Sequence, residues 1–265
     1  MSAARIHPTA IVDPKAELHG SVEVGPYSII GAGVVVGENT WIGPHVVLRG
    51  PMTIGRDNKI YQFASLGELS QDKTSAPDQP TSTVIGDGNV IREYVSIQRG
   101  TMKEFESKRG ATRIGDRNWI MNYCHIAHDC LVGSDTIFAN NASLAGHVEI
   151  GDWVILGGYT LVFQFTRIGP HAFTAFSTGL SGDVPPFVMM QGAPAEPRGI
   201  NKEGLRRRQF TAADIEAIEA AYKLIYRSGK VLAEVKAELA EMASTSVHVQ
   251  QMLDFIQNGK RPLQR

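Results

Sequence analysis

The sequence predicts a mainly β fold, a parallel β-helix, that is followed by a small C-terminal α-helical domain. Three observations lead to this prediction: an apolar residue recurs at every sixth position, a glycine often follows it, and the period changes after about residue 200. A six-residue apolar period is typical of short strands that wind into triangular coils, with three hexads in each coil. Neither the 3.6-residue period of an α-helix nor the alternation of an ordinary strand produces this pattern.

The six-residue period runs through most of the chain in three stretches. The first has an apolar residue at eleven successive positions: Ile6, Val12, Leu18, Val24, Ile30, Val36, Ile42, Leu48, Ile54, Ile60 and Leu66. Glycine directly follows six of these positions: Gly25, Gly31, Gly37, Gly43, Gly55 and Gly67. We expect them at corners of the coil, because a corner favours a residue that tolerates unusual dihedral angles. The period resumes at Ile85 and again at Ile114, and residues 18 apart should lie above one another.

Two polar segments interrupt the period and are predicted to be loops that leave the coil. Residues 68–83 are rich in Pro, Ser, Thr and Asp, and residues 101–112 are also polar. Long insertions in a repeat array tend to carry function instead of stability. We therefore expect a coil domain over residues 1–200 with insertions at about 68–83 and 101–112.

The last part of the chain has the period of α-helices. A proline-rich segment, residues 183–201, ends the coil, and Thr211 with Asp214 forms a predicted capping box. The pattern predicts three amphipathic helices, over residues 211–228, 231–242 and 249–256. We therefore expect a helical domain over residues 201–265.

Composition and charge exclude several classes of protein. The 265 residues carry a net charge of −1, which gives no indication of nucleic-acid binding. No stretch approaches the roughly 18 apolar residues of a membrane span, and residues 1–12 lack the layout of a signal peptide. Cys124 and Cys130 are too few for a disulfide framework, and both hold a compact core position of their hexads. We expect a cytoplasmic protein with two inert, buried cysteines.

A group of polar residues in the third stretch is the candidate site. The rule of 18 stacks His128, Gly146 and Gln164 on one face and places Asp129 beneath His147. An imidazole that is oriented by a carboxylate is the usual arrangement of a general base. Because neighbouring residues of a strand point to opposite faces, Asp129 can assist His128 only at a corner.

Metal binding is the competing hypothesis for the same residues. His125, His128 and His147 fall within about one coil, so three nitrogens could converge on a zinc ion at about 2.0–2.1 Å. His125, however, holds a different position in its hexad from His128, which turns the two side chains apart. We therefore expect neither a metal nor a cofactor.

Six segments that run nearly from end to end of the chain carry a specific resemblance: IGRDNKIYQFASLGE at 54–68, HIAHDC at 125–130, ANNASLAGHVEIGD at 139–152, SGDVPPFV at 181–188, NKEGLRRRQF at 201–210 and AYKLIYRSGK at 221–230. Together they resemble the family of UDP-N-acetylglucosamine O-acyltransferases of lipid A biosynthesis, a branch of the hexapeptide-repeat acyltransferases. The resemblance implies a left-handed coil and a homotrimer with active sites in clefts between subunits. It also implies transfer of a 3-hydroxyacyl group from acyl carrier protein to the 3-hydroxyl of UDP-N-acetylglucosamine, the first step of lipid A biosynthesis.

The resemblance also implies roles for individual residues. His128 matches the general base, Asp129 its orienting carboxylate, and Gly146 the backbone N–H that stabilises the oxyanion. The residues that match sugar and acyl contacts are Gln71, Asp72, Lys73, His125, His147, Gln164 and Phe176. The residues that match the nucleotide-binding group are Asn201, Glu203, Arg207 and Arg208. Acyl carrier protein is acidic, and residues 201–265 carry 11 Lys and Arg against 8 Asp and Glu, so we expect it to dock on the helical domain.

Two departures from the family pattern leave alternatives open. Phe163 and Gln98 stand where the family usually has histidine, so the polar lining of the site differs. An acceptor sugar with a 3-amine, giving N-acyl transfer, is one alternative, and a metal-dependent β-helix enzyme of the carbonic-anhydrase type is another. Phe176 matches a position that is glycine in relatives with long acyl chains, which predicts a shorter chain here.

Overall fold

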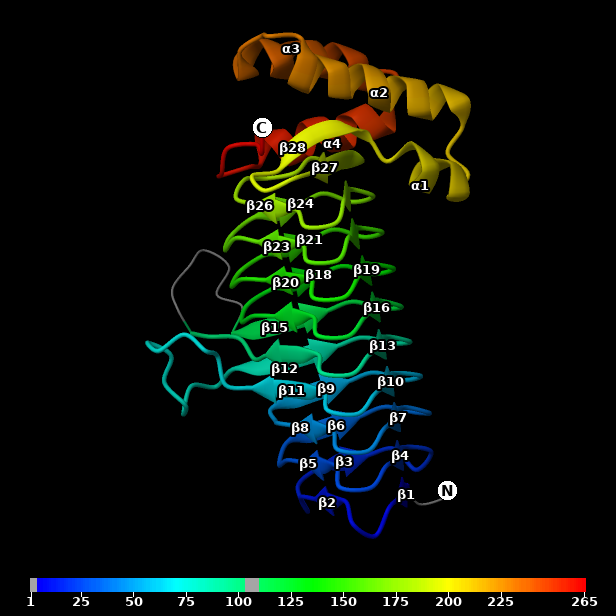
Figure 1. The fold of residues 1–265 in the computed structure, drawn as a ribbon, viewed down its shortest axis with the longest axis vertical. Coiled ribbons are helices and arrows are strands. Elements are labelled where there is room, and N and C mark those ends of the chain that lie inside the picture. The colour runs from blue at the N-terminus through cyan, green and yellow to red at the C-terminus, as the bar shows by residue number, and fades with distance from the viewer. Residues whose placement is uncertain (1–3, 103–109) are drawn as a thin grey trace.

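The computed structural model describes residues 4–102 and 110–265, which form a three-sided prism of stacked strands with α-helices at one end (Figure 1). Each side is one sheet, and we call the sheets I, II and III. Sheet I contains β1 (Arg5–Ile6), β4 (Glu23–Val24), β7 (Trp41–Ile42), β10 (Lys59–Ile60), β13 (Val90–Ile91), β16 (Trp119–Ile120), β19 (Ile137–Phe138), β22 (Ile155–Leu156), β25 (Phe173–Thr174), β27 (Val188–Gln191) and β28 (Glu196–Ile200).

The other two sheets have the same construction. Sheet II contains β2 (Ile11–Val12), β5 (Ile29–Ile30), β8 (Val47–Leu48), β11 (Ser65–Glu68), β14 (Ser96–Gln98), β17 (His125–Ile126), β20 (Ser143–Leu144), β23 (Leu161–Val162) and β26 (Gly179–Leu180). Sheet III contains β3 (Glu17–Leu18), β6 (Val34–Val36), β9 (Met52–Ile54), β12 (Ser82–Ile85), β15 (Ala111–Ile114), β18 (Leu131–Val132), β21 (Glu149–Ile150) and β24 (Arg167–Ile168).

The register of the strands confirms the predicted stacking. Strands of successive coils pair in parallel, and β17 pairs with β20 so that His125 faces Ser143 and Ile126 faces Leu144. The residues at the sixth positions point inward, and Ile126 and Leu144 have no exposed surface. The β27–β28 hairpin is antiparallel and was not predicted, because its prolines indicated only an end of the coil.

The corners of the coil correct one prediction about glycine. Positive φ angles fall mostly on larger residues three positions after an apolar anchor, such as Tyr27 with φ of 60°. Gly25 is required for a different reason: a Cβ atom there would lie 2.7 Å from the carbonyl carbon of Gly43 in the next coil. The close approach of neighbouring coils therefore requires glycine at position 25. Among the six predicted corner glycines, Gly67 is the one with a positive φ, of 79°.

Both insertions leave the prism at the edge where sheet II turns into sheet III, which we call edge II–III. The first joins β11 to β12 and projects from one side of the prism (Figure 1), and the second joins β14 to β15. Most of the second insertion, residues 103–109, lies outside the described residues. The turn between β17 and β18, which holds His128, follows on the same edge one coil further along.

Four helices follow the coil: α1 (Lys202–Arg207), α2 (Ala212–Arg227), α3 (Leu232–Ala243) and α4 (Val247–Gln257). The predicted capping box at Thr211 and Asp214 is present at the start of α2, whereas the single-turn helix α1 was not predicted. The side chain of Gln264 accepts hydrogen bonds from the backbone of Ser181 and Gly182, which fastens the end of the described chain to the coil. The division into domains 1–200 and 201–265 stays a prediction. Among the described helices, none is long and apolar enough to cross a membrane.

Candidate active site

His128 and Asp129 lie together in the turn between β17 and β18, on edge II–III. The Nδ1 atom of His128 is 2.9 Å from Oδ2 of Asp129. Asp129 has a φ of 60°, a corner conformation that brings its carboxylate to the same side as the neighbouring imidazole. The corner therefore allows the two adjacent side chains to contact each other, whereas in a regular strand they would point to opposite faces.

Two threonines that flank the second insertion hold Asp129, one through its carboxylate and one through its backbone N–H. The backbone N–H of Thr101 donates to Oδ1 at 2.9 Å, and the Thr101 hydroxyl donates to Oδ2 at 2.6 Å. The Thr112 hydroxyl accepts from the backbone N–H of Asp129 at 2.9 Å. Burial by itself would raise the pKa of Asp129, but the hydrogen bonds from His128 and Thr101 outweigh it, so the pKa lies below its usual range and the carboxylate is ionised.

The roles of Thr101 and Thr112 were not predicted, although the positions of both residues in the sequence give a signal. Both stand at the boundaries of the second insertion, where the six-residue period stops and restarts. Sequence spacing does not bring Thr101 and Asp129 together, because the insertion breaks the count of 18 between them.

Gly146 and His147 complete the stack one coil above. A Cβ atom on Gly146 would lie 2.5 Å from Cε1 and 2.6 Å from Nε2 of His128, so only glycine fits over the ring. Within the described chain, no residue accepts a hydrogen bond from the Gly146 N–H. His147 places Nε2 3.7 Å from Asp129 Oδ2 and stacks on Phe165 with ring centroids 4.6 Å apart. The arrangement offers a base and a backbone donor side by side.

An apolar groove begins at His125 and follows the outer face of sheet II along the prism. It has a volume of about 640 Å³ and reaches Pro194, with Leu161, Phe163 and Gly179 in its wall. The Nδ1 atom of His125 is 2.7 Å from the hydroxyl of Ser96 in the coil below. Burial, with a smaller contribution from the nearby His128, lowers the pKa of His125, which favours the neutral imidazole. The groove is suited to a flexible apolar chain that starts near the catalytic pair.

The other residues predicted to contact sugar or acyl groups lie in three places. Gln164 is exposed one coil above Gly146 on edge II–III. Gln71, Asp72 and Lys73 lie in the first insertion, where the Gln71 N–H donates to the buried Gln98 side chain at 3.2 Å and Asp72 accepts from Thr74. Phe176 lies on edge I–II, is 69% exposed, and contacts Tyr159 edge to face. Phe176 does not line the groove of its own chain.

The predicted nucleotide-binding group lies away from His128 within one chain. Asn201 caps α1, since its side chain accepts from the N–H of Gly204 and donates to the carbonyl of His171. Arg207 pairs with Glu203 at 3.0 Å on the exposed face of α1. Arg208 packs over the ring of Trp153, which lies on the edge between sheets III and I. The catalytic pair and Arg208 therefore lie at different edges of the same prism.

The possible metal ligands differ from the predicted three histidines. Among the described residues, the donor atoms that could converge on an ion belong to His128, Asp129 and His147, and they lie within 4.8 Å of one another. His125 instead bonds to Ser96. The Asp129 oxygens already accept hydrogen bonds from Thr101 and His128, so a metal would have to displace these bonds. The geometry suits an imidazole–carboxylate pair better than a metal centre.

Comparison with known proteins agrees with this geometry. A family model described as UDP N-acetylglucosamine O-acyltransferase, domain 2, matches residues 183–264, and a model of the bacterial transferase hexapeptide (six repeats) matches residues 3–38 and 111–146. Two relatives carry the name acyl-[acyl-carrier-protein]–UDP-N-acetylglucosamine O-acyltransferase. The one from Thiobacillus denitrificans is 54% identical, over 99% of this chain and 100% of the relative. The one from Halorhodospira halophila is 56% identical, over 98% of this chain and 99% of the relative.

Solved structures agree over the same length. LpxA from Acinetobacter baumannii is 40% identical, with a TM-score of 0.94 over 98% of this chain and 99% of that one. The Arabidopsis UDP-N-acetylglucosamine acyltransferase is 33% identical, with a TM-score of 0.74 over 99% of both chains. The coil is thus the left-handed β-helix of the hexapeptide-repeat fold. The chain belongs to the UDP-N-acetylglucosamine O-acyltransferase family.

Proposed function

We propose that this protein transfers a 3-hydroxyacyl group from acyl carrier protein to the 3-hydroxyl of UDP-N-acetylglucosamine, the first step of lipid A biosynthesis, in the cytoplasm. One observation carries the proposal: the His128–Asp129 pair lies under Gly146 at the start of the apolar groove. The names of the relatives support the same reaction. These names favour a hydroxyl group as the acceptor over the 3-amine, the alternative that Gln98 and Phe163 suggested.

The geometry leads to a simple sequence of bond changes. Asp129 holds Nδ1 of His128, so Nε2 accepts the proton of the sugar 3-hydroxyl. The sugar oxygen then forms a bond to the thioester carbonyl carbon, and the Gly146 N–H stabilises the resulting oxyanion. When the carbon–sulfur bond breaks, protonated His128 returns the proton to the departing thiolate. The products are the acylated sugar nucleotide and the free thiol of the carrier.

The remaining predicted residues supply binding in this proposal. His125, His147 and Gln164 contact the sugar and the acyl group beside the catalytic pair, together with Gln71, Asp72 and Lys73 of the first insertion. Glu203, Arg207 and Arg208 bind the nucleotide, because the planar guanidinium group of arginine matches phosphate oxygens in two-point hydrogen bonding. Asn201 contributes by fixing the start of α1, since its side chain is already used within the chain.

The separation of these groups supports the homotrimer that the family resemblance implies. The catalytic pair lies on edge II–III, Arg208 contacts edge III–I, and Phe176 lies on edge I–II. One substrate can contact all three only where neighbouring copies meet, so we place the active site between subunits.

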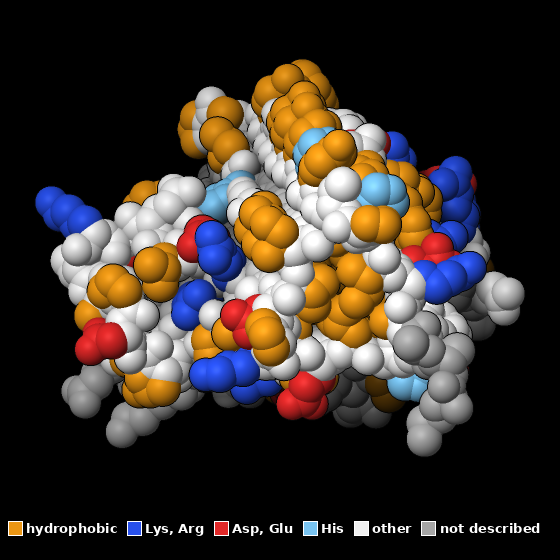
Figure 2. Space-filling view, turned by 90° about the horizontal axis from the view of Figure 1, so that it is seen from below, with side chains coloured by type: hydrophobic (Ala, Val, Ile, Leu, Met, Phe, Trp, Pro, Cys, Tyr) orange, Lys and Arg blue, Asp and Glu red, His pale blue; other side chains and the backbone are white. Residues whose placement is uncertain are grey.

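Edge I–II supplies a surface suited to such a contact. Five aromatic rings stack along it with centroids 4.9–5.3 Å apart, and we call them the aromatic row: Tyr27, His45, Phe63, Tyr94 and Tyr123. Tyr94 and Tyr123 are 47% and 55% exposed. Hydrophobic side chains with a histidine among them also gather in a ridge at the top of Figure 2. Contiguous exposed apolar surface of this kind marks an interaction site.

Product analysis tests the proposed reaction directly. The purified protein is supplied with 3-hydroxyacyl carrier proteins and either UDP-N-acetylglucosamine or its 3-amino analogue, and the product is identified by mass. We expect an ester on the 3-oxygen of UDP-N-acetylglucosamine. Faster formation of the amide would favour the 3-amino acceptor instead, and activity that required stoichiometric zinc would favour the metal-dependent alternative.

Phe176 is predicted to shorten the preferred acyl chain. It lies 48 residues beyond His128, or two and two-thirds coils, which corresponds to about 13 Å along the prism at about 4.8 Å between strands. In the proposed trimer its exposed ring closes a groove on the neighbouring copy. Phe176→Gly should move the preference to a longer chain, measured as the ratio of kcat/KM values for long and short 3-hydroxyacyl carriers. An unchanged ratio, or a parent protein that already prefers the longest carrier, would show that Phe176 does not set the length.

Thr101 is predicted to position the catalytic pair. Thr101→Val removes a hydroxyl hydrogen bond to the ionised Asp129, and loss of a bond to a charged group should lower kcat about tenfold. The KM for UDP-N-acetylglucosamine should change little, and Thr101→Ser should restore kcat. Thr136→Val is the matched control, because the buried Thr136 hydroxyl makes an equally short bond to Asn118 on another edge. Equal losses of kcat in both valine variants would indicate a general effect on packing.

A further inference from the structure

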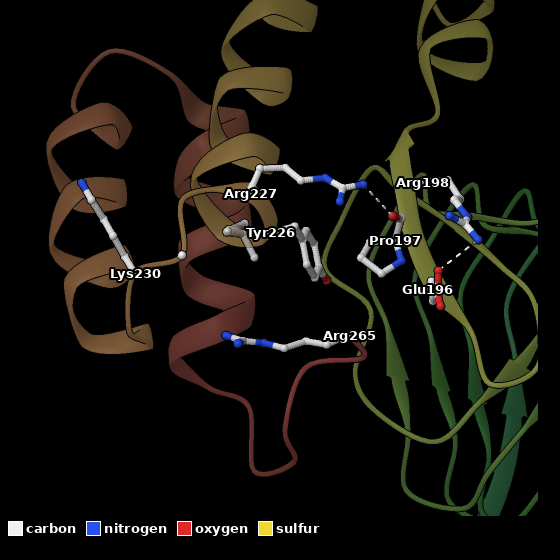
Figure 3. A pocket seen from close by; sticks show the side chains of 9 residues that line it. Glu196, Pro197, Arg198, Tyr226, Arg227, Lys230 and Arg265 are labelled. Atoms are coloured by element: carbon white, nitrogen blue, oxygen red, sulfur yellow. Dashed lines mark hydrogen bonds and ion pairs between the residues drawn. The ribbon is translucent and has the colours of Figure 1, made fainter.

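A second pocket lies between β28 and the end of α2, away from the groove (Figure 3). It has a volume of about 360 Å³, within the range of small-molecule sites. Four of its lining residues are basic and one is acidic: Arg198, Arg227, Lys230 and Arg265, with Glu196. The pocket therefore concentrates positive charge from three separate segments of the chain.

Its charges are only partly neutralised by the protein. Glu196 pairs with Arg198 at 3.0 Å, and Lys230 pairs with Glu238, which is not in the pocket wall. Arg227 makes one long hydrogen bond to the carbonyl of Pro197, at 3.3 Å, and one at 3.5 Å to a tyrosine hydroxyl. Within residues 4–102 and 110–265, no ion pair or hydrogen bond engages the Arg265 side chain. Arg227 and Arg265 thus both line the pocket, and no carboxylate of the described residues pairs with either of them.

Tyr226 adds an independent observation at the base of the same pocket. Its hydroxyl is buried and has no hydrogen-bond partner among the described residues, and Figure 3 shows it in the space between Pro197 and Arg265. Buried polar groups without a partner are rare and costly, so each one needs an explanation. Burial, together with the neighbouring Tyr222, raises the pKa of Tyr226, so the hydroxyl stays protonated and can donate. The Tyr226 hydroxyl is a hydrogen-bond donor without an acceptor, and it lies beside arginines that line the same pocket. A bound anion would serve both as the acceptor and as the partner of the arginines.

We propose that this pocket binds a phosphate group, with Arg227 and Arg265 supplying planar donors and the Tyr226 hydroxyl supplying a third direction. Charge-assisted bonds to phosphate are stronger than neutral ones, and an oxyanion would satisfy the tyrosine hydroxyl at the same time. The site is separate from the His128–Asp129 pair and does not depend on acyl transfer. Two sources carry this chemistry: the phosphodiester of a carrier protein's prosthetic arm, and a free phosphorylated small molecule.

Calorimetric titration with inorganic pyrophosphate tests the site without turnover. All proteins carry Arg207→Gln, which removes the proposed nucleotide group from the measurement. Arg265→Gln should weaken pyrophosphate binding at least tenfold. Tyr226→Phe should weaken it several-fold while leaving the melting temperature equal or higher, since the hydroxyl has no partner to lose. Lys236→Gln, on α3 outside the pocket, should bind like the parent. Absence of binding to the parent, or unchanged binding in both Arg265→Gln and Tyr226→Phe, would overturn the proposal.

Steady-state kinetics of Arg265→Gln then identifies the source, and this step rests on the proposed function. A several-fold higher KM for the acyl carrier, with the KM for the UDP-sugar unchanged, assigns the pocket to the carrier. Both KM values unchanged, with pyrophosphate binding lost, assign it to a free phosphorylated ligand. A rise only in the KM for the UDP-sugar would make the pocket part of the nucleotide site and contradict a separate one. A protein without acyltransferase activity would overturn the proposed function but leave the titration valid.

Discussion

His128→Ala should lower kcat at least about 10²-fold, the effect expected for a positioned general base. The imidazole accepts the proton of the attacking hydroxyl, because Asp129 Oδ2 lies 2.9 Å from Nδ1 and orients the ring so that Nε2 is the accepting nitrogen. The measurement is single-turnover transfer from 3-hydroxyacyl carrier protein to UDP-N-acetylglucosamine at neutral pH.

Two further variants make this result specific. Asp129→Asn keeps the shape of the pair but removes the charge that stabilises the protonated imidazole, so it should also lower kcat, though less than His128→Ala. Because the pKa of Asp129 is lowered, its contribution to folding stability is present above the unfolded pKa of about 3.9 and is lost only in stronger acid. The comparison at neutral pH thus reports catalysis. His19→Ala is the control, since His19 is exposed and bonds to Ser21 far from the site. Activity within a few-fold of the parent in His128→Ala would remove His128 from the role of base.

The double variant Tyr94→Glu with Tyr123→Glu should separate the trimer and abolish activity. The two rings stack at 4.9 Å with an interplanar angle of 5° and are about half exposed, so a neighbouring copy would bury them. Buried aromatic side chains dominate interface energetics, and like charges placed together in an interface cost several kcal/mol. We expect monomers by light scattering, an unchanged circular dichroism spectrum, and a loss of activity of at least about 10²-fold.

Val35→Glu is the matched control for the aromatic row. Val35 is exposed on the outer face of sheet III, where charged residues such as Arg113 and Arg167 also point outward. We do not place a neighbouring copy over that face, so Val35→Glu should remain trimeric and active. A double glutamate variant that stayed trimeric would rule out edge I–II as the contact surface.

Mixed trimers provide a direct test of a site shared between subunits. His128→Ala chains and Arg207→Ala chains should each be nearly inactive alone, and mixing them by unfolding and refolding together should restore part of the activity. Recovery requires that His128 of one copy and Arg207 of another serve one substrate. Without recovery, both residues would have to act within one chain, although His128 lies on edge II–III and the adjacent Arg208 contacts edge III–I.

The sequence by itself determined the architecture and the core. A six-residue apolar period is a local property of the chain. Burial of the side chains at every sixth position favours the coil independently of the residues that surround it. Ile126 and Leu144 are therefore buried above one another, Cys124 and Cys130 are buried thiols that are not joined in a disulfide, and the pKa of Cys124 is raised to about 12 by burial. The stacking rule also placed Gly146 over His128, because no insertion interrupts the count between them.

Only the tertiary structure decided what surrounds these residues. Thr101 reaches Asp129 across an insertion whose length no repeat rule predicts, and the corner at Asp129 depends on a φ of 60° that a larger residue adopts without any glycine signal. Asn201 matched a ligand-binding motif, yet its side chain caps α1 and bonds to His171, a contact between segments 30 residues apart. A period defines which residues face inward, whereas hydrogen bonds between side chains depend on distances that only the folded chain sets.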